Sequence, residues 1–315
     1  MRTAFIEALF EIARQDKRIV LIVGDLGFGV VTPFMEHLPD QFVNAGVAEQ
    51  NMTGMAAGMA LSGKIVFTYS IANFPVLRCL EQIRNDVCYH NANVRIVPVG
   101  GGMAYGALGP SHHATEDIAI MRALPNMMVV APGDPMEARL ATRALIDYRG
   151  PAYLRLGRAG EPDVHSTEPP FELGRAITVR SGNDISLITT GSMLYDAVKV
   201  AEGLAGQGIQ ARVLSMHTVK PLDTEAVLAA AGETSAIFTI EEHSITGGLG
   251  SAVAETLMEA GQRPRYFKRI GLNDRFSSIV GDQDYLRAQY GLDVGGITHT
   301  VQTVLSTSSH PEVSR

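Results

Sequence analysis

Residues 19–29 read IVLIVGDLGFG, and this stretch decides the class of fold. The five apolar residues Ile19–Val23 do not alternate with polar ones, which is typical of a strand buried on both faces of a parallel sheet. Gly24–Gly29 then follows as a strand-to-helix turn in which Asp25 can act as a cap. It is not a P-loop, because the Lys-Ser/Thr ending of that motif is missing.

The same pattern recurs along the chain, where short β-branched runs alternate with longer helical patterns. The predicted strands are Ile19–Val23, Ile65–Thr68, Val94–Val99, Met127–Val130, Ile185–Thr189, Ala211–Leu214, Ala236–Ile240 and Tyr266–Ile270. The predicted helices are Thr3–Gln15, Glu49–Leu61, Val76–His90, Pro135–Ile146, Leu194–Gln207, Thr224–Ala231, Ser251–Ala260 and Ile297–Leu305. This alternation predicts an α/β fold of mostly parallel sheets with helices on both faces.

The alternation is interrupted once, at a proline-rich stretch with little apolar periodicity. We interpret residues 158–174 as a linker between two domains, residues 1–157 and residues 175–306. Residues 307–315 are polar and are expected to form a flexible tail.

Composition restricts the function further. The 315 residues are 46% hydrophobic and 19% charged, which is enough apolar material for a sizeable core. The net charge of −7 argues against binding to nucleic acid or to anionic membranes. Apolar runs fall far short of the ~20 residues of a membrane helix, and the N-terminus does not resemble a signal peptide. Cys79 and Cys88 lack metal-binding spacing, so we expect two buried thiols and a cytoplasmic protein.

Open α/β sheets bind ligands at the carboxyl ends of their strands, and we expect two further polar and glycine-bearing stretches to lie at that edge. Residues 44–52 read NAGVAEQNM and place Glu49 in the first turn of a helix rich in small residues. A carboxylate is favoured there by the helix dipole, so Glu49 is either a functional acid or simply a helix-start acid.

The other stretch begins with three consecutive glycines at 100–102 and ends in adjacent histidines, His112 and His113. Adjacent histidines cannot both reach one metal ion from a helix, and no third ligand has suitable spacing, so we do not expect zinc. The histidines are either site residues or ordinary surface residues.

Taken together and in this order, short motifs spread along the chain resemble the transketolase family of thiamine-diphosphate enzymes. They cover only the second half of that family's pattern, which implies a pyrimidine-binding domain followed by a C-terminal α/β domain. The motifs are Gly24-Asp25-Leu26, Gly46-Val47-Ala48-Glu49-Gln50-Asn51-Met52, Gln82-Ile83-Arg84, Gly109-Pro110-Ser111-His112, Leu124-Pro125-Asn126, Leu156-Gly157-Arg158, Glu241-Glu242-His243 and Tyr290-Gly291-Leu292-Asp293.

The family's diphosphate- and metal-binding motif, Gly-Asp-Gly followed by an asparagine, does not occur in the sequence. The three Gly-Asp pairs are followed by Leu26, Pro135 and Gln283. The resemblance therefore implies a split transketolase whose second polypeptide carries that motif and holds Mg²⁺ or Ca²⁺. Because the family builds its sites at subunit interfaces, we expect a dimer of heterodimers.

The resemblance also assigns roles to individual residues. Glu49 corresponds to the catalytic glutamate that shares a proton with the aminopyrimidine ring of thiamine diphosphate. Asp25, Leu26 and Arg78 are expected beside the cofactor. Phe74 is the candidate for the aromatic ring that stacks on the pyrimidine, although it could equally be a core residue.

The expected substrate is a sugar phosphate, and the reaction is transfer of a two-carbon ketol unit from a ketose to an aldose. Arg2 and Arg158 correspond to the family's phosphate clamp, unless they are plain surface arginines. His112, the second catalytic candidate, and His113 are expected to contact the sugar.

Two departures from the family pattern point to an altered substrate. Leu108 stands where ordinary transketolases have an aspartate, and Gly100 stands where they have a histidine. The loss of two hydrogen-bonding side chains predicts a branched, deoxy or sulfonated ketose as substrate.

Two other functions remain open at this stage. The chain could be the β subunit of a 2-oxoacid dehydrogenase or part of a synthase related to deoxyxylulose-phosphate synthase, although the match at Arg158 argues against the dehydrogenase. It could also be a non-catalytic assembly subunit, against which the presence of Glu49 argues.

Overall fold

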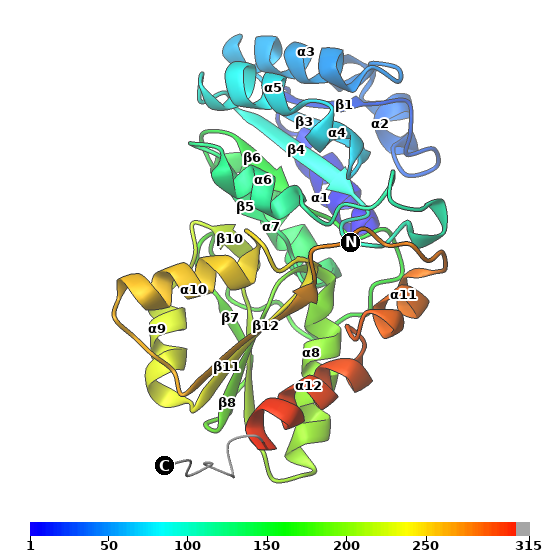
Figure 1. The fold of residues 1–315 in the computed structure, drawn as a ribbon. Coiled ribbons are helices and arrows are strands. Elements are labelled where there is room, and N and C mark those ends of the chain that lie inside the picture. The colour runs from blue at the N-terminus through cyan, green and yellow to red at the C-terminus, as the bar shows by residue number, and fades with distance from the viewer. Residues whose placement is uncertain (307–315) are drawn as a thin grey trace.

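The computed structural model describes residues 1–306 and contains two sheets, each wound with helices (Figure 1). The first sheet has seven strands in the order β10-β5-β6-β4-β3-β1-β2, and the second has five in the order β12-β11-β8-β9-β7. The strands of the first sheet are β1 (Ile19–Val23), β2 (Phe42–Asn44), β3 (Ile65–Ile71), β4 (Val94–Val99), β5 (Met128–Val130), β6 (Ala152–Leu154) and β10 (Thr218–Lys220). The strands of the second are β7 (Ile177–Arg180), β8 (Ile185–Thr189), β9 (Ala211–Ser215), β11 (Ala236–Ser244) and β12 (Tyr266–Leu272).

All neighbouring strands pair in parallel except β10 with β5 and β7 with β9, so the prediction of two mostly parallel sheets is confirmed. The helices that accompany the first sheet are α1 (Arg2–Ala13), α2 (Thr32–His37), α3 (Glu49–Leu61), α4 (Phe74–Leu77), α5 (Leu80–Gln82), α6 (Asp117–Ala123) and α7 (Pro135–Asp147). Those of the second are α8 (Leu194–Ala205), α9 (Thr224–Glu233), α10 (Leu249–Glu259), α11 (Gln283–Gln289) and α12 (Val294–Ser306).

The strand β1 shows why its apolar run is continuous. Val20 and Ile22 point into a core formed with α3 and α6, whereas Leu21 and Val23 point into a second core formed with α1 and α7. Every residue of the strand is buried. The prediction of a strand covered on both faces is therefore confirmed.

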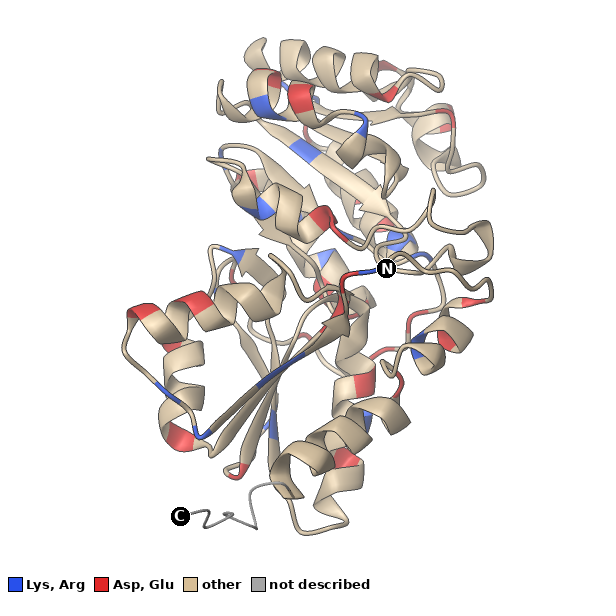
Figure 2. Cartoon of the chain, in the orientation of Figure 1, with Lys and Arg blue, Asp and Glu red and all other residues tan. Residues whose placement is uncertain are grey.

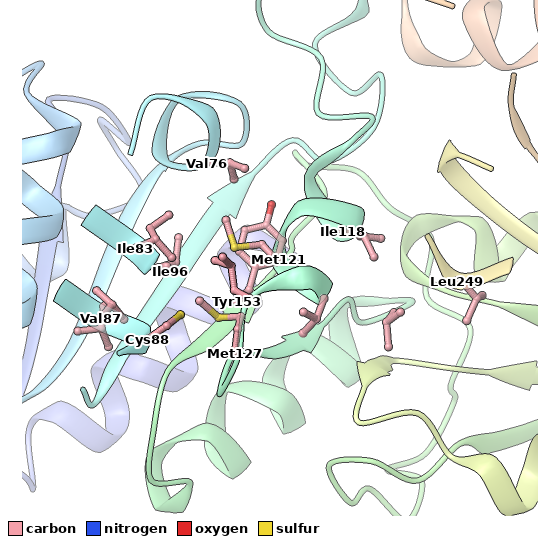
Figure 3. Packing of buried hydrophobic residues seen from close by; sticks show 14 of the residues in the cluster. Val76, Ile83, Val87, Cys88, Ile96, Ile118, Met121, Met127, Tyr153 and Leu249 are labelled. Carbon is pink, nitrogen blue, oxygen red and sulfur yellow. The ribbon is translucent and has the colours of Figure 1, made fainter. Parts of the chain in front are cut away.

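One apolar core joins the two sheets. It runs from the first sheet through α6 to the helices α9 and α10 of the second sheet. Figure 3 shows Met121 of α6 among residues of the first sheet and its helices, while Ile118 of the same helix lies toward Leu249 of α10. Packing across this core fixes the two sheets relative to one another.

The predicted helix 76–90 is wrong in detail, because the segment is broken into α4, α5 and a π-helical stretch at Ile83–Cys88. The break falls next to Arg78, whose backbone carbonyl accepts a hydrogen bond from the Gln50 side chain at 3.0 Å. A tertiary contact therefore uses a carbonyl that a continuous helix would have needed.

The sequence also failed to indicate the strands β2, β6, β7 and β10, each of only three or four residues. The strand β10 belongs to the second half of the chain but pairs antiparallel with β5 in the first sheet. Lys220 at its end donates to the backbone oxygens of Arg122 and Leu124, which ties it to the end of α6.

Other expectations can be compared with the described residues. Cys79 and Cys88 are free and buried, as predicted. Residues 155–176 contain no helix or strand. Within residues 1–306, no helix is long and apolar enough to cross a bilayer. The expected flexible tail, residues 307–315, lies outside the described residues.

A buried ion pair holds the two sheets together next to the apolar core. Arg155, which follows β6, donates to the carboxylate of Asp117 at 2.7 Å, and both side chains are almost fully buried. Arg155 also donates to the backbone oxygens of Ala114 and Glu242. It therefore links the first sheet, the loop that contains the adjacent histidines, and β11. Tyr153 donates to the same Asp117 carboxylate at 2.7 Å.

Replacing Asp117 with Asn should strongly destabilise the protein, because Arg155 would keep its buried charge and lose its counter-charge. We expect the free energy of unfolding, measured by urea denaturation at pH 7, to fall by about 3–5 kcal/mol. The control is Glu7→Gln, which removes an exposed pair with Arg139 and should cost less than about 1 kcal/mol. An Asp117→Asn variant as stable as the control would contradict this role.

The effect should also depend on pH. Burial alone would raise the pKa of Asp117, but Arg155, His243 and the hydrogen bonds from Arg155 and Tyr153 outweigh it, so the pKa lies below its ordinary value. A depressed acid pKa stabilises the fold fully above about pH 4, and the contribution is lost as the pH falls through the folded-state value. The difference in free energy of unfolding between wild type and Asp117→Asn should therefore become smaller at acidic pH.

Candidate active site

The candidate site lies at the carboxyl edge of the first sheet, where the ends of β1 and β3 meet the start of α3. Gly24 follows β1, and a Cβ atom built on it would lie 3.5 Å from the Ser70 hydroxyl and 3.7 Å from the side chain of Glu49. Glu49 and Ser70 therefore both lie next to the end of β1. The Ser70 hydroxyl is buried and has no hydrogen-bond partner among residues 1–306.

Glu49 is a deeply buried carboxylate in the first turn of α3. Its side chain is only 1% exposed, and its Oε2 atom accepts a hydrogen bond from Nη1 of Arg78 at 2.6 Å. Arg78 itself is 47% exposed. The position at the start of a helix favours a negative charge, so the helix and Arg78 both stabilise the carboxylate.

The predicted stacking residue, Phe74, lies next to this ion pair. It begins α4 and is half-buried, so it is not the plain core residue of the alternative interpretation. The guanidinium of Arg78 lies 5.1 Å from the centre of its ring. The ring of His112 also makes an edge contact with Phe74, with a centroid distance of 5.1 Å.

Tyr105 continues the contacts and was not predicted from the sequence. Its ring lies 6.5 Å from that of His112, and the guanidinium of Arg158 lies 5.1 Å from its centre. A Cβ atom on Gly100 would lie 2.1 Å from the Tyr105 ring, so the glycine at 100 leaves room for this tyrosine. Burial raises the pKa of Tyr105, while the charges of Arg158 and Arg2 act against that rise.

These side chains form one continuous row, which we call the contact row. Its members follow the ends of β2, β3, β4 and β6, and they keep the order of those strands in the sheet. The sequence suggested all of its members except Tyr105. The contact row consists of Glu49, Arg78, Phe74, His112, Tyr105 and Arg158.

Two predicted cofactor residues lie on the turn after β1. Asp25 is exposed and adopts a left-handed backbone conformation with φ of 55°. Its carboxylate accepts a hydrogen bond from the Asn44 side chain at 3.0 Å, and its backbone N–H donates to the same side chain. These bonds fix the turn that follows β1 beside the end of β2. Leu26 is half-buried against the core under α1.

The remaining predicted substrate residues do not line one common cavity. Leu108 and Arg158 line a cavity of about 530 Å³ together with Tyr105. His113 is buried instead and lines a separate cavity of about 270 Å³, and burial lowers its pKa. Arg2, the first residue of α1, has a buried Nε atom without a hydrogen-bond partner in the described part of the chain.

Comparison with known families decides the identity of this fold. The model of the transketolase pyrimidine-binding domain matches residues 1–160, and that of the transketolase C-terminal domain matches residues 174–297. This chain belongs to the transketolase family. Glu49, Phe74 and Arg158 lie in the first of these two domains.

Transketolase relatives of the same length are similar along nearly the whole chain. An apulose-4-phosphate transketolase subunit from Phocaeicola vulgatus is 44% identical over 301 residues, which cover 95% of both chains. The 6-deoxy-6-sulfo-D-fructose transketolase subunit SqwH from a Clostridium species is 40% identical and covers 96% of this chain and 94% of its own. A solved split-gene transketolase, described as an inactive β4 tetramer, superposes with a TM-score of 0.87 at 39% identity and 97% coverage of each chain. This chain therefore has the domain content and length of the smaller subunit of a split transketolase.

Proposed function

We propose that this chain supplies the pyrimidine-binding half of a thiamine-diphosphate site and transfers a two-carbon ketol unit from a ketose to an aldose once a partner subunit completes that site. The contact row is the observation that carries the proposal. It joins a buried carboxylate at one end to an arginine facing a cavity at the other. We propose that the first end binds the aminopyrimidine ring of the cofactor and that the second end binds the anionic group of the sugar.

The residues around Glu49 fit the pyrimidine half of the cofactor. A buried carboxylate and a half-exposed aromatic ring suit a flat ring that must both stack and donate a hydrogen bond. The buried Ser70 hydroxyl beside Glu49 is a further polar group with unused hydrogen-bonding capacity. When bound, thiamine diphosphate supplies a carbanion and an electron sink. In this proposal Glu49 shares a proton with the pyrimidine ring nitrogen, while Asp25 and Leu26 border the cofactor from the turn after β1.

The other end of the contact row fits an anionic substrate. Arg158 and Arg2 both bring positive charge to Tyr105, and Arg158 lines the larger cavity. We propose that the two arginines bind the phosphate or sulfonate of the sugar while His112 contacts the reacting carbons. In this proposal the buried His113, whose Nε2 atom lies 3.4 Å from the backbone oxygen of Gly106, holds the loop that carries His112. The relatives named for apulose 4-phosphate and sulfofructose support a non-standard sugar of this anionic class.

The surface around the row suits a partner subunit. Four apolar side chains follow successive strand ends on this edge, and each is more than half exposed: Phe28, Val47, Leu77 and Leu108. The nearby helix α3 carries no charged residue after Glu49, and Figure 2 shows little charge on it. We propose that a second polypeptide, which holds the diphosphate and Mg²⁺ or Ca²⁺, covers these residues, and that two such pairs form a heterotetramer in the cytoplasm. The relative described as an inactive tetramer of β chains alone supports this requirement.

Replacing Glu49 with Gln tests the proposed chemistry. Glutamine has nearly the same shape and can hydrogen-bond, but it cannot share a proton with the pyrimidine. In the complex reconstituted with the partner, exchange of the thiazolium C2 proton for deuterium should slow by roughly two to four orders of magnitude. Glu11→Gln, on an exposed face of α1, serves as the control and should leave the rate unchanged. Exchange at the wild-type rate in Glu49→Gln would show that this glutamate is only a helix-start acid.

Replacing Leu108 with Asp tests substrate specificity. A carboxylate in the larger cavity restores a hydrogen-bonding group for a straight-chain sugar, so kcat/KM for xylulose 5-phosphate should rise by about tenfold relative to that for the enzyme's own donor. The control is Met258→Asp, a similarly exposed position on α10. If the ratio of kcat/KM for xylulose 5-phosphate to that for the enzyme's own donor changes equally in Leu108→Asp and Met258→Asp, Leu108 does not line the sugar site.

A further inference from the structure

The two partners of the Glu49–Arg78 ion pair differ strongly in burial. The Glu49 side chain is buried, whereas the Arg78 side chain is half exposed and its guanidinium lies over the ring of Phe74. Arg78 therefore makes two contacts at once, a hydrogen bond to Glu49 at 2.6 Å and a cation–π contact with Phe74. These are the same two groups that the proposed function assigns to the aminopyrimidine ring.

A guanidinium is chemically suited to take the place of that ring. It is planar and delocalised, it carries several N–H donors, and it stacks well on aromatic faces. An aminopyrimidine is also planar and also donates N–H groups. One aromatic face and one carboxylate can therefore bind either a guanidinium or an aminopyrimidine. The two groups cannot occupy the same position at the same time.

Burial explains why Glu49 needs such a partner. A buried carboxylate without a counter-charge or a hydrogen bond is costly, and Glu49 is too deeply buried to be solvated by water. Arg78 lies between α4 and α5, outside both helices, and its side chain reaches solvent. Its head group can therefore leave Glu49 without disrupting a helix.

We propose that Arg78 is a stand-in for the cofactor: it occupies the pyrimidine position in the cofactor-free chain and must move away when thiamine diphosphate binds. This inference rests on the proposed function, and it replaces the expectation that Arg78 helps to bind the cofactor. Arg78 keeps Glu49 paired before assembly and weakens cofactor binding by competition. If the guanidinium occupies the site for about nine-tenths of the time, the apparent Kd for the cofactor is about tenfold weaker than without it.

The test is Arg78→Met, which retains an unbranched side chain but removes the positive charge and the N–H donors of the guanidinium. In the complex with the partner subunit, titration calorimetry with thiamine diphosphate and Mg²⁺ should give a Kd about tenfold lower than wild type. The cofactor-free variant should melt at a lower temperature, because Glu49 loses its partner. The opposite signs of these two effects separate competition from a purely structural role.

Two matched variants complete the experiment. Arg84→Met removes an exposed arginine from the neighbouring π-helical stretch and should change neither the Kd nor the melting temperature. Arg78→Lys keeps the charge but not the planar fork, and its Kd should lie between those of wild type and Arg78→Met. A Kd for Arg78→Met that is unchanged or higher than wild type would overturn the inference and return Arg78 to the cofactor-binding set. Failure of every complex, wild type included, to bind the cofactor would instead refute the proposed function.

Discussion

Parallel strands that share a sheet must all end at the same edge, and the candidate site depends on this constraint. The contact row follows the ends of β2, β3, β4 and β6 and skips only β1. Each strand end contributes one or two residues, and the sheet spaces them at the contact distances of neighbouring side chains. Residues more than a hundred positions apart, such as Glu49 and Arg158, are thereby joined through four intervening side chains.

Two buried carboxylates in this fold show how burial can serve different purposes. Asp117 is paired with an equally buried arginine and with Tyr153. Solvent does not reach this pair, and it links the two sheets. Glu49 is equally buried, but its arginine is half exposed and can be displaced. The two ion pairs therefore differ in the exposure of the arginine and not in that of the carboxylate. We propose that the pair with the exposed arginine, Glu49–Arg78, is functional.

Much of the fold and site follows from the sequence, because the responsible signals are local. All eight predicted strands are present, since continuous apolar runs such as Ile19–Val23 report burial on both faces directly. Glu49 was singled out by its place at the start of a helix of small residues. What was missed depends on tertiary neighbours: β10 gains its partner from the other half of the chain, and the helix at 76–90 breaks beside Gln50. Tyr105 carries no motif, and its only signal was the glycine at 100 that leaves space for its ring.

We infer that this chain holds only half of a cofactor site and needs a partner subunit to bind thiamine diphosphate. Titration calorimetry of thiamine diphosphate and Mg²⁺ into the isolated chain, and then into its complex with the partner, tests it most directly. We expect weak or undetectable binding by the isolated chain and tight, magnesium-dependent binding by the complex. Tight, magnesium-dependent binding by the isolated chain would contradict it.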